Sequence, residues 1–383
     1  MGIKKKILII HPEGNIFNNP NLLAIANYLS DAFDVDVLMP KVRYPHTSKF
    51  QMISYKPIWN RIKNRIHHYF VYRLVFGLFS LPYHKKYDFI FGVDRAGIID
   101  AHLFSKKYKC NYALISYEIF FEDETSKQFK EIEVRSCQDI SFAVVQDDVR
   151  AQFLATENHI QNEKMLLIPV ASDEIAQTSE RKYILHKKFN LPFHTNILIF
   201  TGSVAQWTCI DEILASASHF LPSNWVLVIH DRYGRAKESI QQMGIEHTLG
   251  ENIFLIEDSI FSFEELNAIL SDAELGIVSY RPIDGSPYTG KNILHIGLAS
   301  GKFSTYMKNG LPTLIYRSHA LGKVVTDHKL GLFIDDLTLL KASLESFNGR
   351  QEYEMQCRTF FNSKLSFDNY KKILKNKIDR CIS

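Results

Sequence analysis

The sequence predicts an α/β fold of two doubly wound domains, each built around a parallel sheet. Short apolar runs alternate with amphipathic segments of helical length along most of the chain. A polar stretch without a clear period, Ser172 to Arg181, interrupts this alternation, and we place the domain boundary there. With 383 residues, the chain is long enough for two such domains with separate cores.

The composition is that of an ordinary soluble globular protein, with 46% apolar and 23% charged residues and a net charge of +3. The five cysteines are scattered without a C-x-x-C pair, so neither a zinc site nor a disulfide framework is expected, and reduced thiols suit the cytoplasm. The apolar run Ile7 to Ile10 is too short for a signal peptide, and no window is long enough for a membrane span.

The N-terminal domain opens with a buried strand, Lys5 to Ile10, a helix, Pro20 to Asp31, and a second strand, Asp36 to Met39. This βαβ start lacks G-x-G-x-x-G, so no dinucleotide site is expected. Ligands of parallel sheets bind at the carboxyl ends of strands. The loop after the first strand therefore offers candidates for acceptor contact or catalysis, or simple turn residues: His11, Glu13 and Asn15.

Residues 41–86 differ from the rest of the chain, with ten Lys or Arg, ten aromatic residues and no Asp or Glu. Ile58 to Leu81 is predicted as one basic, aromatic-rich helix. Such a segment is typical of a helix in the interface of an anionic membrane. Packing on the sheet with a solvated basic face and nucleic-acid binding are the alternatives, although no recognition module accompanies the segment.

Two further strands of this domain end in acidic residues. Tyr87 to Gly92 leads to Asp94, and Asn111 to Ser116 leads to Glu118 and Glu122. A carboxylate at a strand end can act as a general acid or base, and Glu118 follows its strand most closely. Acidic residues before a helix can equally complement the helix dipole. A helix, a strand over 140–146, a second helix and a strand over 166–170 complete the predicted domain.

The C-terminal domain begins with the strand Asn196 to Phe200 and a loop containing Gly202 and Ser203, whose amides can face a phosphate. The alternation continues with strands over 225–229, 254–257 and 275–279. The strand over 225–229 is followed by Arg232, and the loop over 280–291 holds Arg281 and Lys291.

Residues 296–316 predict a loop, a short helix and a strand. Ser300 is a natural N-cap, Gly310 suits the position past the last turn, and Pro312 prevents continuation. Lys302 lies in the first turn, where free amides and a partial positive charge favour a phosphate. The spacing of Gly297 and Gly301 excludes a P-loop, because it is one residue short.

This stretch resembles the donor-site helix of GT-B glycosyltransferases, with a pattern near S-x-K-x-x-E-Y-M-x-x-G-x-P-x-I. The matching residues are Ser300, Lys302, Tyr306, Met307, Gly310 and Pro312. Thr305 replaces the Glu of many family 4 relatives, whereas Lys302, Ser304 and Tyr306 fit a K-x-S-x-Y variant. An earlier passage matches the order of family 4-like enzymes more loosely, at Glu118, Glu133, Gln146, Asp147 and Arg150.

The resemblance implies GT-B architecture, in which two Rossmann-like domains face each other across a cleft. The acceptor-binding domain would span 1–175, the nucleotide-sugar domain 180–365, and a final helix over 366–383 would cross back to the first domain. Donor contacts would come from Gly202, Ser203, Arg232, Arg281, Lys291, Ser300, Lys302, Ser304, Thr305 and Tyr306. The family's E-x7-E pair is absent, with Thr305 at the position of its second Glu, so stereochemistry is left open.

We therefore expect a glycosyltransferase that moves a sugar from a nucleoside diphosphate, with UDP slightly favoured, to a saccharide or lipid-linked acceptor. The catalytic candidates are three residues of the N-terminal domain, Glu118, Asp94 and His11. The candidates for binding the acceptor are Glu13, Asn15 and Glu122. No metal, cofactor or nucleic acid is expected, and the protein would be cytoplasmic with peripheral membrane contact through 41–86. A catalytically inactive GT-B-like subunit and a nucleotide-sugar epimerase are the alternatives.

Overall fold

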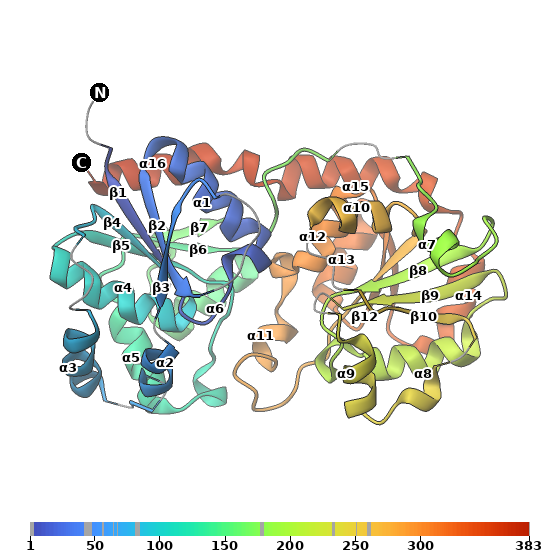
Figure 1. The fold of residues 1–383 in the computed structure, drawn as a ribbon, viewed down its shortest axis with the longest axis horizontal. Coiled ribbons are helices and arrows are strands. Elements are labelled where there is room, and N and C mark those ends of the chain that lie inside the picture. Colours follow the sequence, from blue (N-terminus) through green and yellow to red (C-terminus); the bar gives the residue numbers. More distant parts are fainter. Residues whose placement is uncertain are drawn as a thin grey trace. The chain divides into compact units, whose positions relative to one another are not determined.

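The structure is a computed structural model, which describes residues 4–41, 48–55, 57–63, 65–66, 68–80, 85–176, 180–231, 234–249, 251–258 and 262–382 (Figure 1). The chain forms two compact units. Unit 1 comprises residues 1–174, 284–299 and 366–383, and unit 2 comprises residues 175–283 and 300–365. Each unit is an α/β layer structure with one parallel sheet.

Unit 1 has a seven-stranded sheet in the order β3-β2-β1-β4-β5-β6-β7, and neighbouring strands are parallel throughout. The order reverses between β1 and β4, which is the switch point where ligands of such sheets bind. The strands are β1 Lys6–Ile10, β2 Asp34–Pro40, β3 Gln51–Tyr55, β4 Phe89–Val93, β5 Asn111–Ile115, β6 Ala143–Val145 and β7 Met165–Leu167.

Helices cover both faces of this sheet, because alternate side chains of the strands are buried on opposite sides. Ile7 and Ile9 lie in the cluster that includes Leu374 and Ile378 of α16, whereas Leu8 and Ile10 lie in the cluster with Phe76 and Phe104. The helices of unit 1 are α1 Pro20–Ala32, α2 Pro57–Lys63, α3 Tyr69–Phe79, α4 Asp94–Tyr108, α5 Lys127–Cys137, α6 Asp148–Asn158, α11 Lys291–Leu294 and α16 Lys371–Ile382.

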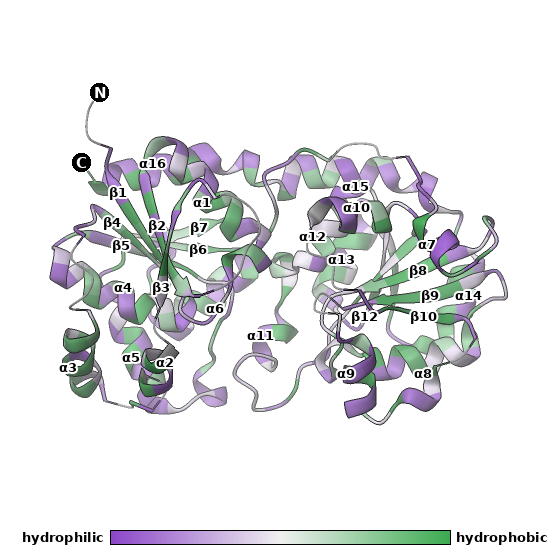
Figure 2. Ribbon diagram, viewed as in Figure 1, coloured by the Kyte–Doolittle hydropathy of each residue, from purple (hydrophilic) through white to green (hydrophobic). Residues whose placement is uncertain are grey.

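Unit 2 has a six-stranded parallel sheet in the order β10-β9-β8-β11-β12-β13, with its switch point between β8 and β11. The central strands are its most hydrophobic part (Figure 2). The strands are β8 Asn196–Thr201, β9 Trp225–His230, β10 Ile253–Ile256, β11 Leu275–Ser279, β12 Thr313–Tyr316 and β13 Gly331–Ile334. The helices are α7 Ile184–Lys188, α8 Ile210–Phe220, α9 Ala236–Gln242, α10 Phe263–Leu270, α12 Gly301–Lys308, α13 His319–His328, α14 Leu340–Glu345 and α15 Glu354–Phe360.

The predicted single helix over residues 58–81 is wrong, because the segment forms two helices, α2 and α3. Arg65 donates its backbone N–H to Ile62 in a closing turn, and the backbone of His68 is extended before α3. A strand that the sequence analysis missed, β3, precedes them and pairs with β2. Within the described residues, no helix combines the length and the apolar content that a membrane span requires.

The loop and short helix over residues 284–299 belong to unit 1, although the sequence analysis grouped them with the C-terminal domain. Backbone and side-chain bonds hold them there: Leu298 donates to Asp147 (2.9 Å), and its carbonyl accepts from Val170 (3.1 Å). Sequence separation hides such contacts, since the partners are more than a hundred residues apart in the chain.

Two glycines allow β4 and α4 to approach closely at the switch point of unit 1. A Cβ atom at Gly97 would lie 2.5 Å from the carbonyl oxygen of Ile10, and one at Gly92 would lie 2.5 Å from that of Gly97. Both obstacles are backbone atoms, which cannot move aside as a flexible side chain can. Glycine at these positions therefore sets where the ends of β1 and β4 lie.

Replacing Gly97 by Ala should destabilise the protein by about 1–3 kcal/mol, because the new methyl group overpacks against backbone. Chemical denaturation would measure the change. Gly77→Ala in α3 is the control, since a Cβ there meets nothing within 4 Å among described atoms, and removing a helical glycine gains roughly 0.5–1 kcal/mol. Equal stability of the Gly97 variant and wild type would show that the β4–α4 approach is not tight.

Candidate active site

In unit 2, the loop after β8 and the first turn of α12 lie together at the switch point. Gly202 has φ of +110°, a backbone conformation that favours glycine, and its N–H donates to the carbonyl of His230 (3.0 Å). A Cβ atom built there would lie 3.4 Å from Cε of Lys302. The glycine loop and the lysine stem are thus direct neighbours, as the sequence predicts.

The ammonium group of Lys302 is buried and has no hydrogen-bond partner among the residues that the structure describes. It lies 3.8 Å from the ring centroid of Phe200 and 5.7 Å from that of Tyr280. Burial lowers the pKa of Lys302 to about 7, because the charged form is poorly solvated there. A buried cation beside a glycine loop and two aromatic rings, without a hydrogen-bond partner among the described residues, is suited to binding an anion.

The helix that carries Lys302 is held firmly to the sheet. The Ser300 hydroxyl accepts from the N–H of Phe303 (3.2 Å), which confirms the predicted N-cap, and pairs with the hydroxyl of Tyr280 (2.7 Å). The Tyr306 hydroxyl accepts from the N–H of Thr201 (3.0 Å) at the end of β8. Burial raises the pKa of Tyr306, so its hydroxyl keeps its proton. The start of α12 is therefore pre-positioned against β8.

Other donor candidates make internal contacts. The Arg281 guanidinium binds Asp211 (2.8 Å) and Glu212, so its charge is already neutralised. The Thr305 hydroxyl donates to the carbonyl of Gly301 (2.8 Å) in its own helix. Ser304 is buried, Ser203 is exposed, and Arg232 lies outside the described residues. In unit 2, the structure brings Gly202, Ser300, Lys302 and Tyr306 together with Phe200 and Tyr280, two aromatic residues that the sequence analysis did not include among the site candidates.

Lys291 lies in unit 1, where its ammonium group pairs with Asp123 and its backbone N–H donates to Glu124 (3.0 Å). Its contacts are therefore with acidic residues of its own unit. The expectation that it contacts the donor stays a prediction.

At the switch point of unit 1, Asp94 and Glu118 follow β4 and β5. Asp94 has a left-handed backbone (φ 52°), and its Oδ1 accepts from the N–H groups of Tyr117 (2.6 Å) and Glu118 (2.9 Å). Burial raises the pKa of Asp94 well above its ordinary value, and the neighbouring Glu118 charge adds to this. Burial also raises the pKa of Glu118 to about 7, although the charge of Arg150 and the hydrogen bond from Asn292 act to lower it.

Two residues missed as site residues hold this region, Arg150 and Asn292. The buried Arg150 guanidinium donates to the carbonyl of Tyr117 (2.6 Å) and to Oε1 of Gln146 (2.8 Å). Its other bonds go to the carbonyl of His295 (3.1 Å) and to Oδ1 of Asn292 (3.1 Å). Arg150 was noted only as part of a motif. No sequence signal marks Asn292, whose partners Arg150 and Glu118 lie 142 and 174 positions away.

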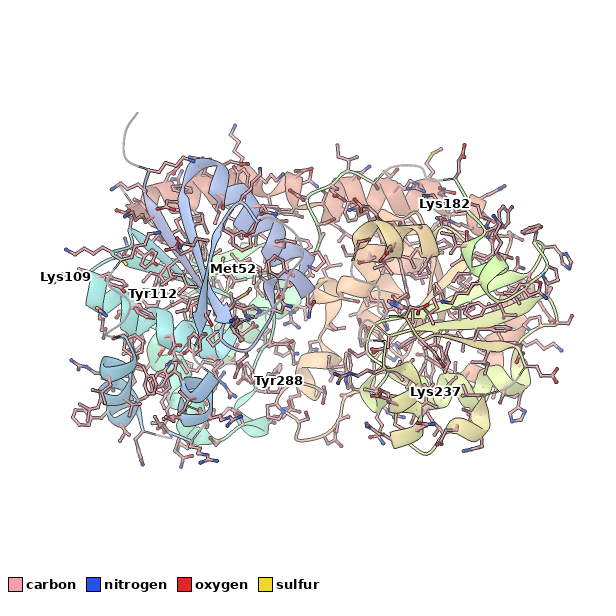
Figure 3. The ribbon with its side chains drawn as sticks, viewed as in Figure 1. Met52, Lys109, Tyr112, Lys182, Lys237 and Tyr288 are labelled. Carbon is pink, nitrogen blue, oxygen red and sulfur yellow. The ribbon has the colours of Figure 1, made fainter. Side chains whose placement is uncertain are left out.

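The remaining candidates lie after β1. Burial lowers the pKa of His11 to about 4, so its ring is neutral at pH 7, and a Cβ atom at Gly14 would clash with it. Glu13 is exposed and accepts from the hydroxyl of Tyr288 (3.3 Å), a residue labelled in Figure 3. The Asn15 side chain accepts from the N–H of Phe17 (3.1 Å), which is a turn role.

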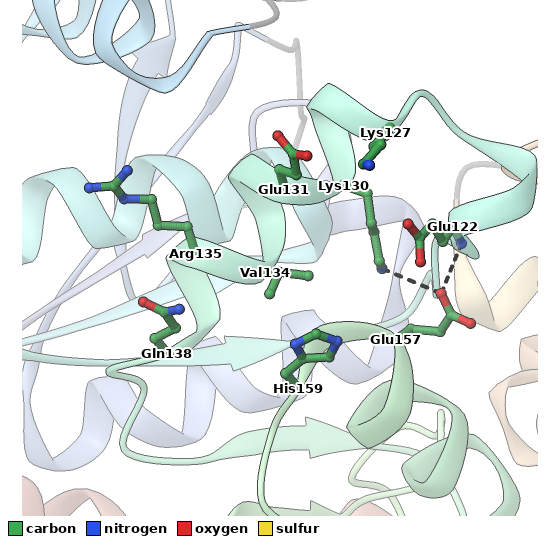
Figure 4. A pocket seen from close by; sticks show the side chains of 9 residues that line it. All are labelled: Glu122, Lys127, Lys130, Glu131, Val134, Arg135, Gln138, Glu157 and His159. Atoms are coloured by element: carbon green, nitrogen blue, oxygen red, sulfur yellow. Dashed lines mark hydrogen bonds and ion pairs between the residues drawn. The ribbon is translucent and has the colours of Figure 1, made fainter.

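Glu122 contacts α5 and α6 instead of the switch-point carboxylates Asp94 and Glu118. It lines a pocket of about 380 Å³ beside α5 and the end of α6, together with Lys130, Glu157 and His159 (Figure 4). Its backbone N–H donates to the carboxylate of Glu157 (2.8 Å). Among the described residues, no group of three or more His, Cys, Asp or Glu could hold a metal ion.

Comparison with known proteins identifies the fold. The chain has the GT-B fold of glycosyltransferases, and solved structures with this fold match nearly its whole length. Sucrose-phosphate synthase from Thermosynechococcus elongatus has a TM-score of 0.69 at 12% identity, covering 98% of this chain and 99% of that chain. Anabaena HepE in complex with UDP and glucose has a TM-score of 0.68 at 10% identity, and the match covers 98% of this chain and 100% of that chain. WaaG, a glycosyltransferase involved in lipopolysaccharide biosynthesis, has a TM-score of 0.65 at 13% identity, and the match covers 96% of this chain and 99% of that chain.

Residues 260–372 match the family model described as "Glucosyltransferase 3-like, C-terminal domain". The matched segment contains α12 with Lys302 and Tyr306. No curated protein matches the chain.

Replacing Lys302 by Met should stabilise the free protein near pH 7 and lower, on the order of 2 kcal/mol, and less at pH 10. Between pH 7 and the ordinary lysine value of 10.5, the unfolded chain binds a proton that the folded lysine lacks. The unfolding free energy of the wild type should therefore gain a contribution that rises with pH through this window. The variant, which lacks the lysine, should not show this rise. Denaturant unfolding at pH 7 and 9.5 would measure the difference, with Lys308→Met as the control for replacing a lysine of α12.

Proposed function

We propose that the protein is a glycosyltransferase that moves a sugar from a nucleoside diphosphate to a hydroxyl group of a saccharide acceptor. The buried Lys302 ammonium beside the loop of Gly202, at the start of α12, carries the proposal. The GT-B fold and the matched C-terminal segment support it.

In the proposed reaction, an acceptor oxygen forms a bond to the anomeric carbon while the bond from that carbon to the diphosphate breaks. The diphosphate leaves with the electron pair and gains negative charge. Lys302 and the positive end of the α12 helix dipole would stabilise this charge in a site largely shielded from water, where such interactions are strong. Arg281 would add little, because Asp211 and Glu212 already neutralise it.

The acceptor hydroxyl must lose its proton in the same reaction. A carboxyl group of unit 1 would take it, and Glu118 suits this role because its pKa of about 7 leaves it partly ionised at neutral pH and a competent base. Asp94 would orient the acceptor or share the proton. His11, neutral at pH 7, and the exposed Glu13 would contribute hydrogen bonds to sugar hydroxyls.

The donor is proposed to be a UDP-sugar, because HepE, which has the same fold, is described in complex with UDP and with UDP-glucose. The acceptor is proposed to be a saccharide or lipid-linked saccharide of cell-surface polysaccharide or lipopolysaccharide. The likeness to WaaG is the support for this class of acceptor.

A lipid-linked acceptor would require contact with a membrane, and α3 has a suitable surface. Its outer face exposes Phe70 (67%), Leu74 (59%) and Leu78 (70%), whereas Tyr72 and Phe76 pack inward. Most of the helix is hydrophobic in Figure 2, and Arg73 is exposed among the apolar residues. Since residues 41–86 contain ten basic and no acidic residues, we propose that this face binds an anionic lipid surface in the cytoplasm.

Lys302→Ala should abolish nucleotide binding, because the diphosphate would lose the buried side-chain cation on which the proposed donor site depends. Calorimetry and thermal shift against UDP, GDP, ADP, dTDP and CMP would test wild type and variant. We expect selective binding of UDP, lost at least tenfold in the variant. Lys308→Ala at the other end of α12 is the matched control. Wild-type affinity in the Lys302 variant would remove the lysine from the site, and no binding by wild type would favour the inactive-subunit alternative.

Leu74→Glu with Leu78→Glu should reduce binding to vesicles containing anionic phosphatidylglycerol by tenfold or more, since each replacement places a carboxylate in the proposed lipid contact. Co-sedimentation with vesicles would measure binding. Ile373→Glu, an exposed apolar residue of α16 (48%), is the control and should bind as wild type does. Failure of wild type to sediment with these vesicles would contradict the membrane proposal.

A further inference from the structure

The Asn292 side chain uses all of its hydrogen-bonding groups in the region of Glu118. Its Nδ2 donates to Oε2 of Glu118 and to the carbonyl of Tyr288 (3.1 Å). Its Oδ1 accepts from the N–H of Ile119 (3.0 Å) and from Arg150 (3.1 Å). Asn292 is only 3% exposed, so these bonds have little competition from water. A buried amide bonded on every side has one orientation, and it gives one orientation to the carboxylate it holds.

The segment that carries Asn292 is fixed to unit 1 by contacts that do not involve this residue. Lys291 donates its N–H to Glu124 and pairs through its ammonium group with Asp123. Leu298 donates to Asp147. The His295 ring stacks on Phe153 with centroids 4.1 Å apart. Loss of the Asn292 amide should therefore leave the segment in place.

We propose that Asn292 is a positioning residue for the transferase reaction, whose amide holds the Glu118 carboxyl group to receive the proton of the acceptor hydroxyl. This inference rests on the proposed function. Asn292 does not itself receive the proton, which passes from the acceptor oxygen to Glu118 and then to solvent. The residue reaches Glu118 from a part of the sequence just before α12, the helix of Lys302.

Several charged groups act on Glu118 besides the amide. Glu13 after β1 and Asp94 at the start of α4 are like charges, and Arg150 of α6 is the opposing charge. His295, in the same segment as Asn292, has a pKa lowered by burial. All four remain when Asn292 is replaced. Because a hydrogen bond to a carboxylate favours its ionised form, removing the amide should raise the pKa of Glu118.

The test is a pH titration of Glu118 by NMR of protein labelled with ¹³C at the glutamate carboxyl groups. Glu118→Gln would identify the resonance. In Asn292→Ala we expect the midpoint to rise by about one pH unit. Asn292→Asp places a second carboxylate against Glu118 and should raise it at least as much, which keeps the test available if the alanine variant does not fold.

Asn158→Ala is the matched control, because Asn158 is another buried asparagine of unit 1 whose Nδ2 donates to a glutamate, Glu133 (2.9 Å). It should lose stability without moving the midpoint of Glu118. An unchanged midpoint in folded Asn292→Ala would overturn the proposal.

With an active donor and acceptor, the acidic limb of kcat/KM should move to higher pH in Asn292→Ala by the same interval, and an unmoved limb would equally overturn the positioning role. The proposed function itself would be contradicted if the wild-type protein bound none of the nucleotides tested above, and that experiment does not involve Asn292. The two failures are therefore distinguishable.

Discussion

Parallel pairing of neighbouring strands is the constraint on which both candidate sites depend. In a parallel sheet, every strand ends at the same edge, so residues that directly follow different strands are brought together. This places His11, Asp94 and Glu118 at one edge of unit 1, after β1, β4 and β5. It places Gly202 near the helix that follows β11 in unit 2. The chemistry of each unit follows from the order of its strands.

Two buried cations show how differently the units treat charge. Arg150 in unit 1 donates to Gln146, Tyr117, His295 and Asn292, so its charge is fully used in holding backbone and side chains. Lys302 in unit 2 has aromatic faces nearby and no hydrogen-bond acceptor among the described residues. A satisfied buried cation is structural, whereas an unsatisfied one is costly unless a ligand completes it.

Local patterns predicted much of the fold, because caps and apolar runs act over a few residues. Ser300 caps α12, Gly310 has a positive φ, and β12 runs over the predicted Thr313–Tyr316. The edge strand β3 was missed because its burial is slight, with four of its five residues not buried.

Long-range partners could not be read from the sequence. Asn292 meets Glu118 from 174 positions away, and Arg281 is neutralised by Asp211 and Glu212 of α8, about seventy positions earlier. A lone Arg or Asn in a loop carries no sign of which side chain it will meet.

The chain passes between the two units at four places, after residues 174, 283, 299 and 365. A chimaera made at the single polar boundary near residue 175 would therefore exchange more than unit 2. It would also replace α16 and residues 284–299, the segment whose Asn292 donates to Glu118. Exchange of donor preference between relatives of this fold would need residues 284–299 and 366–383 kept with the N-terminal parent.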